Sequence, residues 1–349
     1  QLREVRWQVL LSVLANVISG IAFVAVVLQA LEGRLSLGDI ALYSGAVVSM
    51  QGALGGIISA LASANESVLF YSRYADLLAL PEPLPLAGSP SPIAALKSGI
   101  ELRNVSFRYS ESHPWVLRNV NLCIPAGQRV ALVGLNGAGK TTLVKLLTRL
   151  YDPTEGQVLW DDTDIRAFDP GELRRRIGII FQDFVRYELT VQENIGLGDV
   201  TRIGDESSVR RAATQAGVDD VIGNLPRGYK TTLSRWLAEG ESGADLSGGE
   251  WQKIALARMF MRQADLLILD EPTAALDAQA EYDLYNSFVE LVGQRTCLLI
   301  THRFSTVRMA DVVAVIEDGR ITEYGPHSEL LALDKTYARL YRMQAERYR

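Results

Sequence analysis

The segment 130–142 constrains the fold more than any other part of the chain. A short apolar run, Val-Ala-Leu-Val, is followed by the glycine-rich loop Gly134–Gly139 and then by Lys140-Thr141-Thr142. The spacing Gly-x-x-x-x-Gly-Lys-Thr predicts a buried strand, a phosphate-binding loop and a helix that starts where the loop ends. A chance glycine turn in front of a helix is the alternative interpretation.

The residue types in this loop suit a nucleoside triphosphate with Mg²⁺. Glycines leave the backbone N–H groups open and tolerate positive φ, and the following helix directs its positive dipole end at the anion. Lys140 supplies a charge for the β- and γ-phosphates, and Thr141 supplies a hydroxyl for Mg²⁺. The predicted nucleotide contacts in this segment are Gly134, Asn136, Gly137, Ala138, Gly139, Lys140, Thr141 and Thr142.

The N-terminal part of the chain predicts a membrane helical hairpin. No charged residue occurs from Val9 to Leu31 or from Ile40 to Asn65, and each stretch exceeds the roughly 20 residues that cross a bilayer as a helix. We expect helices at about 5–31 and 39–78 within a membrane part spanning 1–80. Two buried helices of a soluble core are the alternative. Gln51 is polar at membrane depth, and a hydrogen bond to a neighbouring helix is favoured over a water-filled path.

Charge and composition place the remaining boundaries. Prolines make 81–98 an extended linker, and a soluble domain is expected over 99–349. Arginines flank the two stretches, so the positive-inside rule predicts that both ends of the hairpin lie in the cytoplasm.

The net charge of −6 gives no sign of a nucleic-acid-binding surface. Cys123 and Cys297 lie in apolar runs, and we expect both to be small core residues in a reducing compartment.

Two further apolar runs of the soluble domain end in residues that can carry chemistry. The run 266–269 is followed by Asp270 and Glu271, and the run 297–300 by Thr301 and His302. Gln182 follows a third strand-like run. Open α/β sheets bind ligands at the carboxyl ends of their strands. The site prediction is that Asp270 holds Mg²⁺ and that Glu271 accepts a proton from the attacking water. A solvated pair of turn acids is the alternative.

Two other features invite both a functional and a structural interpretation. Tyr109 ends an alternating strand pattern and would stack on adenine, or it is an ordinary surface tyrosine. Ser247-Gly248-Gly249-Glu250 opens a helix, which suits an anion. The same Ser-x-x-Glu spacing also makes a capping box, and taken alone the capping interpretation is favoured.

Taken together, these motifs resemble an ATP-binding cassette (ABC) transporter of the exporter type, over the whole length of the chain. Residues 134–141 resemble the Walker A loop, 246–250 the signature motif, and 266–271 the Walker B strand. Segment 272–277 resembles the D-loop and 240–243 the exporter X-loop. Gln182 resembles the Q-loop glutamine, His302 the switch histidine and Tyr109 the adenine-stacking aromatic.

The resemblance implies a fold, cofactors and partners. The fold is a P-loop NTPase of the α/β class, with a RecA-like core, an antiparallel β subdomain and an α-helical subdomain, preceded by the membrane hairpin. The cofactors are ATP and Mg²⁺, and the implied metal ligands are Thr141, Gln182 and Asp270. The partner is a second ABC subunit, identical or not, in a head-to-tail ATP sandwich. Contacts to that shared nucleotide are implied for Ser247, Gly248, Gly249 and Asp277.

The implied function is ATP hydrolysis coupled to export of a peptide, lipid or hydrophobic small molecule, with Glu271, His302 and Gln182 as the catalytic residues. The implied location is the cell membrane, multi-pass, with the nucleotide-binding domain in the cytoplasm. A non-transport ABC ATPase and a regulatory nucleotide switch are the alternatives. Glu250 stands where glutamine is commoner in the family. The hairpin corresponds to the last two membrane helices, so we expect earlier helices to precede this chain.

Overall fold

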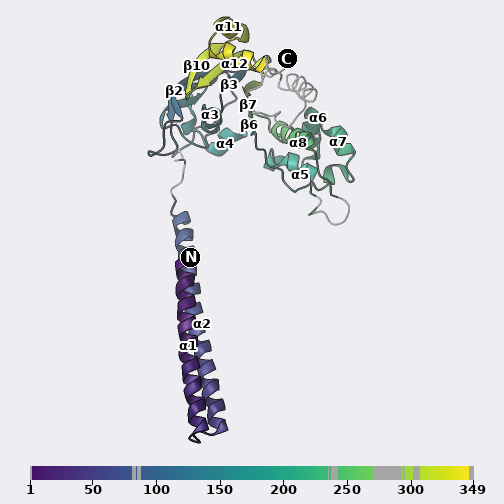
Figure 1. Ribbon diagram of the computed structural model, residues 1–349. Coiled ribbons are helices and arrows are strands. Elements are labelled where there is room, and N and C mark those ends of the chain that lie inside the picture. The colour runs from purple at the N-terminus through teal and green to yellow at the C-terminus, as the bar shows by residue number, and fades with distance from the viewer. Residues whose placement is uncertain are drawn as a thin grey trace. The chain divides into compact units, whose positions relative to one another are not determined.

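The chain divides into two compact units, Gln1–Glu82 and Pro83–Arg349, in a computed structural model (Figure 1). The structure describes residues 2–80, 84, 88–234, 236, 243–270, 293, 295–301 and 307–345, with the side chains of residues 2–16, 37, 58, 344 and 345 excepted.

The first unit is a hairpin of two long helices, α1 (Leu2–Leu31) and α2 (Leu37–Leu78). A short turn joins them, and Ser36 caps α2. The Ser36 hydroxyl accepts from the Asp39 N–H, and the Asp39 carboxylate accepts from the Ser36 N–H, which is a complete capping box. The box fixes the start of α2, and after the short turn α2 runs back along α1, where Gln51 contacts Ser19.

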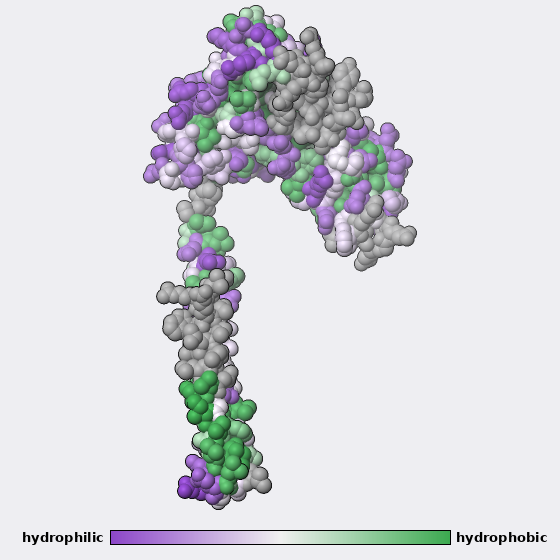
Figure 2. All heavy atoms as spheres, viewed as in Figure 1, coloured by the Kyte–Doolittle hydropathy of each residue, from purple (hydrophilic) through white to green (hydrophobic). Residues whose placement is uncertain are grey.

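The hairpin exposes apolar side chains along its length, and they gather beside the turn in Figure 2. Among the residues searched, Gly38–Leu78 is long and apolar enough to cross a membrane, and Val17–Leu31 is a shorter apolar helix. The Gln51 amide donates to the Ser19 hydroxyl on the facing helix. The interpretation of Gln51 as a bond between helices is therefore the one that the structure supports.

The second unit holds two sheets. The first is antiparallel, in the order β2-β1-β4-β5. Its strands are β1 (Gly99–Phe107), β2 (Leu117–Pro125), β4 (Glu155–Trp160) and β5 (Thr163–Asp164). The second has the order β10-β9-β3-β8-β7-β6. Its strands are β3 (Arg129–Val133), β6 (Ile177–Ile180), β7 (Leu266–Asp270), β8 (Thr296–Ile300), β9 (Val312–Glu317) and β10 (Arg320–Gly325).

Five strands of the second sheet are parallel, and β10 pairs antiparallel with β9 at one edge. β7 and β8 are buried at every position, as expected for strands covered on both faces. Leu132 lies opposite Ile300, and Asp270 also lies opposite Ile300. β3, β7 and β8 therefore end at one edge of the sheet.

Helices cover this framework and form a separate helical part. Those of the second unit are α3 (Lys140–Leu147), α4 (Pro170–Arg175), α5 (Val191–Gly196), α6 (Glu206–Gln215), α7 (Asp219–Gly223), α8 (Gly248–Met261), α11 (His327–Ala332) and α12 (Thr336–Ala345). One core lies between the two sheets and α3, and another joins α5, α6 and α8 to the other face of β7 and β8. The expected α/β class, with its antiparallel and helical subdomains, is confirmed.

One expectation about the core is wrong. Cys297 is fully buried, and burial raises the pKa of its thiol, but Cys123 is exposed. β2 alternates, so that Leu122 and Ile124 point into the core and Cys123 points out. The apolar neighbours of Cys123 suggested burial, whereas the two-residue period of the strand decides its orientation.

Candidate nucleotide site

The glycine-rich loop leaves the carboxyl end of β3 and leads directly into α3. Gly139 is the N-cap of α3 in a left-handed conformation with φ of 107°, and Gly137 has φ of 83°. The backbone at both positions is one that residues with a side chain rarely adopt. The α3 N-terminus therefore meets the loop without a side-chain cap, which leaves its first N–H groups open to an anion.

Close packing also requires glycine in this loop. A Cβ atom at Gly134 would lie 2.4 Å from the carbonyl oxygen of Ile316, and one at Gly139 would lie 2.7 Å from Leu117 Cδ2. The loop is thus held against β9 and β2 on its inner side. Asn136 and Gly137 are exposed on its outer side, and Ala138 is buried. This cradle fits a phosphate chain, as the sequence predicted.

Lys140 and Thr142 are both buried within the first turn of α3. The Lys140 ammonium donates to the carbonyl oxygens of Gly134 and Leu135, at 2.8 and 3.1 Å. The ammonium therefore bonds to the backbone of the loop itself. When a phosphate chain is bound, its oxygens would take the place of these carbonyl oxygens as acceptors. The Thr142 hydroxyl lies 3.1 Å from the Tyr109 hydroxyl.

The proposed magnesium ligands come together from distant parts of the sequence. The Thr141 hydroxyl lies 3.5 Å from Asp270 Oδ2. Asp270 is only 4% exposed, at the end of β7. Gln182 is exposed two residues beyond the end of β6, at the same edge. A hydroxyl and a carboxylate fit a Mg²⁺ ion whose other ligands are phosphate and water. The described residues contain no group of three or more His, Cys, Asp or Glu that could hold a metal by themselves.

Tyr109 belongs to an aromatic cluster next to α3. Its ring makes edge contacts with Phe107 and Tyr151, with centroid separations of 5.0 and 5.3 Å. The Lys145 ammonium lies over the Tyr109 ring and donates to its hydroxyl at 3.3 Å. Tyr109 is 41% exposed, so the ring is held in one place while part of it stays open to a base.

The signature segment forms a local cap. Ser247 is the N-cap of α8 and makes a full capping box with Glu250. The structural interpretation of this spacing is therefore correct. Gly248 and Gly249 form the first turn of α8 without Cβ atoms, so a nucleotide on a second subunit would still have access to their N–H groups. That contact stays a prediction.

Three residues of the predicted site lie outside the described residues, namely Glu271, Asp277 and His302. The X-loop residues 240–242 lie outside them as well. Thr301, directly before His302, is buried at the end of β8.

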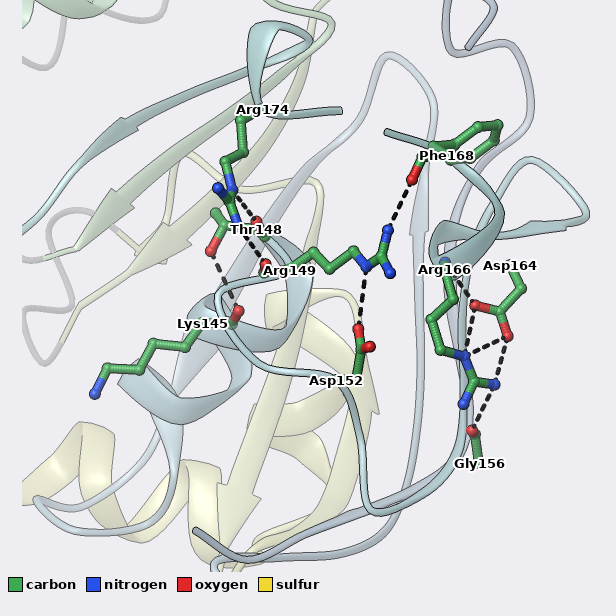
Figure 3. Close-up of polar contacts among 9 residues, drawn as sticks. All are labelled: Lys145, Thr148, Arg149, Asp152, Gly156, Asp164, Arg166, Phe168 and Arg174. Atoms are coloured by element: carbon green, nitrogen blue, oxygen red, sulfur yellow. Dashed lines mark hydrogen bonds and ion pairs between the residues drawn. The ribbon is translucent and has the colours of Figure 1, made fainter. Parts of the chain in front are cut away.

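Two arginines that belong to none of the sequence motifs, Arg149 and Arg174, lie at the C-terminal end of α3. Arg149 is fully buried, donates to the Phe168 carbonyl at 2.7 Å and pairs with Asp152 at 3.1 Å (Figure 3). Arg174 donates to the carbonyls of Thr148 and Arg149, which satisfies the C-terminal end of α3. The phosphate-loop helix is thereby fixed at the end opposite to its glycines.

Arg258 on α8 forms hydrogen bonds with the segment 185–194, which follows Gln182 in the chain. Its guanidinium donates to the carbonyl of Val185 and to the Asn194 backbone and side chain, and it lies over the Tyr187 ring. Burial lowers the pKa of this guanidinium. The signature helix and the segment that follows Gln182 are therefore held together by one side chain.

We expect Arg149→Met to destabilise the second unit by about 3 to 5 kcal/mol, because it leaves Asp152 and a buried carbonyl without their charged donor. Arg166→Met is the matched control, since the Arg166–Asp164 pair shown beside it is exposed. The control should cost no more than about 1 kcal/mol. Urea unfolding of the two variants checks the difference, and equal stabilities would contradict it.

Comparisons with known proteins agree with this site. Residues 117–274 match the family described as ABC transporter. A putative multidrug export ATP-binding/permease protein of Staphylococcus aureus (strain NCTC 8325 / PS 47) is 42% identical over 253 residues, covering 72% of this chain and 42% of the relative. The similar protein YgaD of Bacillus subtilis (strain 168) is 34% identical over 349 residues, covering 98% of this chain and 58% of YgaD.

A solved structure, that of a bacterial Atm1-family ABC exporter with ATP bound, superposes with a TM-score of 0.72 and 30% identity. It is matched over 96% of this chain and 57% of its own length. The chain carries the nucleotide-binding domain of the ABC transporter family, and it resembles exporters of that family over nearly its whole length. An ABC domain binds ATP, and the apolar hairpin is consistent with a membrane part in the same polypeptide. The chain spans about half the length of the curated relatives it matches.

Proposed function

We propose that the protein hydrolyses ATP and uses that reaction to export a substrate across the cytoplasmic membrane. The observation that carries the proposal is the meeting of Thr141 and Asp270, 3.5 Å apart, beside a glycine cradle that fits a phosphate chain. The apolar hairpin in the same polypeptide provides a membrane part on which the reaction can act. The relatives named as multidrug exporters support export as the outcome.

In the proposed reaction, Lys140 and the first N–H groups of α3 bind the β- and γ-phosphates. Thr141, Asp270 and Gln182 would hold Mg²⁺, which neutralises charge on the phosphate oxygens. Glu271 accepts a proton from the attacking water, and His302 fixes the γ-phosphate and the water. Tyr109 stacks on the adenine, where the Phe107 and Tyr151 rings hold its own ring in place.

Each site is completed by a second subunit in the proposed assembly. Ser247, Gly248, Gly249 and Asp277 contact the nucleotide bound to the opposite subunit, head to tail, so that closure of the dimer accompanies ATP binding. The membrane part is multi-pass, with the nucleotide-binding domain in the cytoplasm and the linker 81–98 between the two. A peptide, a lipid or a hydrophobic small molecule fits such a path as the substrate.

Glu271→Gln tests the hydrolysis step in the full-length protein. Glutamine keeps the size of the side chain but cannot accept the proton, so steady-state phosphate release should fall by at least about 100-fold while ATP still binds. Glu250→Gln is the matched control, because glutamine preserves the capping box, and it should hydrolyse ATP normally. Undiminished turnover in Glu271→Gln would refute the assignment of the base.

Export itself is tested in proteoliposomes. Uptake of a fluorescent hydrophobic probe into inside-out vesicles should require ATP and should be lost in Glu271→Gln. Normal ATP hydrolysis without transport of any probe from a peptide, lipid and drug panel would favour a non-transport ATPase instead.

A further inference from the structure

A second cleft lies on the opposite edge of the parallel sheet from the nucleotide site. Its volume is about 530 Å³, and residues of α4, of the short helix η2 (Val200–Arg202) and of the segment that ends α8 line it. Arg262 in this cleft donates to the carbonyl of Ile177, the first residue of β6. Asp270 and Gln182 lie at the far ends of the strands, so the two sites are separated by the length of the sheet.

The cleft is dominated by arginine. Five of its lining residues are Arg174, Arg175, Arg176, Arg202 and Arg262, whereas the carboxylates among them are Glu172 and Asp199. Such a concentration of positive charge stands out in a chain whose net charge is −6. A cleft lined by charges of one sign focuses the electrostatic field and attracts ions of the opposite charge.

Three of these arginines have carboxylate partners. Arg175 pairs with Glu172, Arg202 pairs with Asp199 at 2.8 Å, and Arg176 pairs with Asp265 at 3.4 Å. These pairs leave the other two arginines to account for the net charge of the cleft.

Arg174 and Arg262 bond to neutral groups in the described part of the chain. Arg174 donates to the carbonyls at the end of α3, as Figure 3 shows, and Arg262 donates to those of Gly198, Arg174 and Ile177. Carbonyl oxygens satisfy the donors but do not cancel the charge. The arginines that line the cleft therefore outnumber its lining carboxylates, and the cleft keeps an excess of positive charge.

The packing of these charges has an energetic consequence. Burial lowers the pKa of the Arg262 guanidinium, the neighbouring Arg175 lowers it further, and Asp199 opposes both effects. Guanidinium groups are thus held close enough to repel one another. A multivalent anion between them would remove that repulsion and gain charge-assisted hydrogen bonds.

We propose that this cleft, defined by Arg174, Arg175, Arg202 and Arg262, binds a ligand that carries clustered phosphate groups. Guanidinium groups match phosphate oxygens with paired donors, and here they come from more than one wall of the cleft. The volume lies within the range of small-molecule sites, which is about 300 to 1,000 Å³. A single carboxylate would neutralise one arginine and leave the others facing each other.

Calorimetric titration with tripolyphosphate tests the proposal. The full-length protein is first saturated with Mg²⁺ and a non-hydrolysable ATP analogue, so that the probe cannot occupy the nucleotide site. Arg175→Gln and Arg202→Gln should each weaken binding by about tenfold. Arg175 is exposed and bonds only to Glu172 among the described residues, so its variant should fold normally.

Arg210→Gln is the matched control. Arg210 forms an exposed pair with Glu206 on α6, outside the cleft, as Arg175 does with Glu172 within it. Its removal should leave the affinity for tripolyphosphate unchanged. Absence of binding, or equal weakening by all three variants, would overturn the proposal, because equal weakening indicates a diffuse charge effect.

A second titration identifies the source of the phosphates. A soluble short-chain phosphatidylinositol bisphosphate replaces tripolyphosphate under the same conditions. Tighter binding of the lipid, lost in Arg175→Gln, assigns the cleft to a lipid headgroup, whereas tighter binding of tripolyphosphate assigns it to a free polyphosphate. Binding of either probe that persists in both cleft variants counts against the site.

Discussion

Lys140→Ala is expected to reduce ATP affinity by about 100-fold or more and to bring hydrolysis below detection. The ammonium is buried, and it already bonds to two loop carbonyls at 2.8 and 3.1 Å. Alanine removes the charge that binds the β- and γ-phosphates and leaves both carbonyls without this donor. Charge-assisted hydrogen bonds are worth about 1.5 to 3 kcal/mol each, and two of them account for the predicted loss.

Lys145→Ala is the control for this prediction. Lys145 lies further along α3, and its ammonium contacts the Tyr109 ring and hydroxyl instead of the loop. Its removal takes the same charge from the same helix, so a general electrostatic effect would appear in both variants. Binding of a fluorescent ATP analogue and phosphate release measure the two effects. Unchanged affinity in Lys140→Ala would contradict the assigned role of the loop.

The sequence predicted the parts of the site that local patterns encode. The strand before Gly134 and the strand before Glu271 are continuous apolar runs, and such runs form strands buried on both faces. Since buried parallel strands share an edge, the approach of Thr141 to Asp270 could be expected although they are far apart in sequence. The structure agrees, with 3.5 Å between the two side chains.

Contacts to backbone carbonyls could not be predicted in this way. Arg149 is buried because the carbonyl of Phe168 lies beside it, and Arg258 because the carbonyls of Val185 and Asn194 do. No side-chain pattern marks a carbonyl that happens to lie near in the fold. A signal was present only for Asp152, which follows Arg149 at a spacing that allows a local ion pair.

At two positions, Cys123 and Ser247, the sequence contained two local signals that favoured different interpretations. For Cys123 the two-residue period of β2 prevailed over the apolar character of its neighbours. At the start of α8 the capping box and a nucleotide contact are compatible at the two glycines. The box uses the Ser247 hydroxyl as an acceptor and the N–H groups of Ser247 and Glu250 as donors, and it leaves the N–H groups of Gly248 and Gly249 outside the box. The structural interpretation thus does not replace the functional one at this helix.

Asp270→Asn is expected to abolish Mg²⁺-dependent hydrolysis while ATP still binds through Lys140. Asparagine keeps the volume of the side chain in a position that is only 4% exposed, so the packing at the end of β7 should persist. The amide lacks the negative charge that favours a hydrated Mg²⁺ beside the Thr141 hydroxyl. Affinity for ATP should therefore lose its dependence on Mg²⁺ concentration, which nucleotide titrations with and without the metal measure.

Asp265→Asn is the control for this prediction. It tests whether the loss of Mg²⁺ dependence is specific to Asp270 or follows the removal of any carboxylate next to β7. Asp265 directly precedes β7 at its opposite end, where it pairs with Arg176. Its replacement should leave the Mg²⁺ dependence intact, since that end of the strand is remote from the phosphate loop. If Asp270→Asn retained Mg²⁺-dependent hydrolysis, the contact with Thr141 would be structural and the metal would have to be held by the phosphates and other side chains. Loss of the metal response in Asp270→Asn alone would place Mg²⁺ at the carboxyl edge of the sheet.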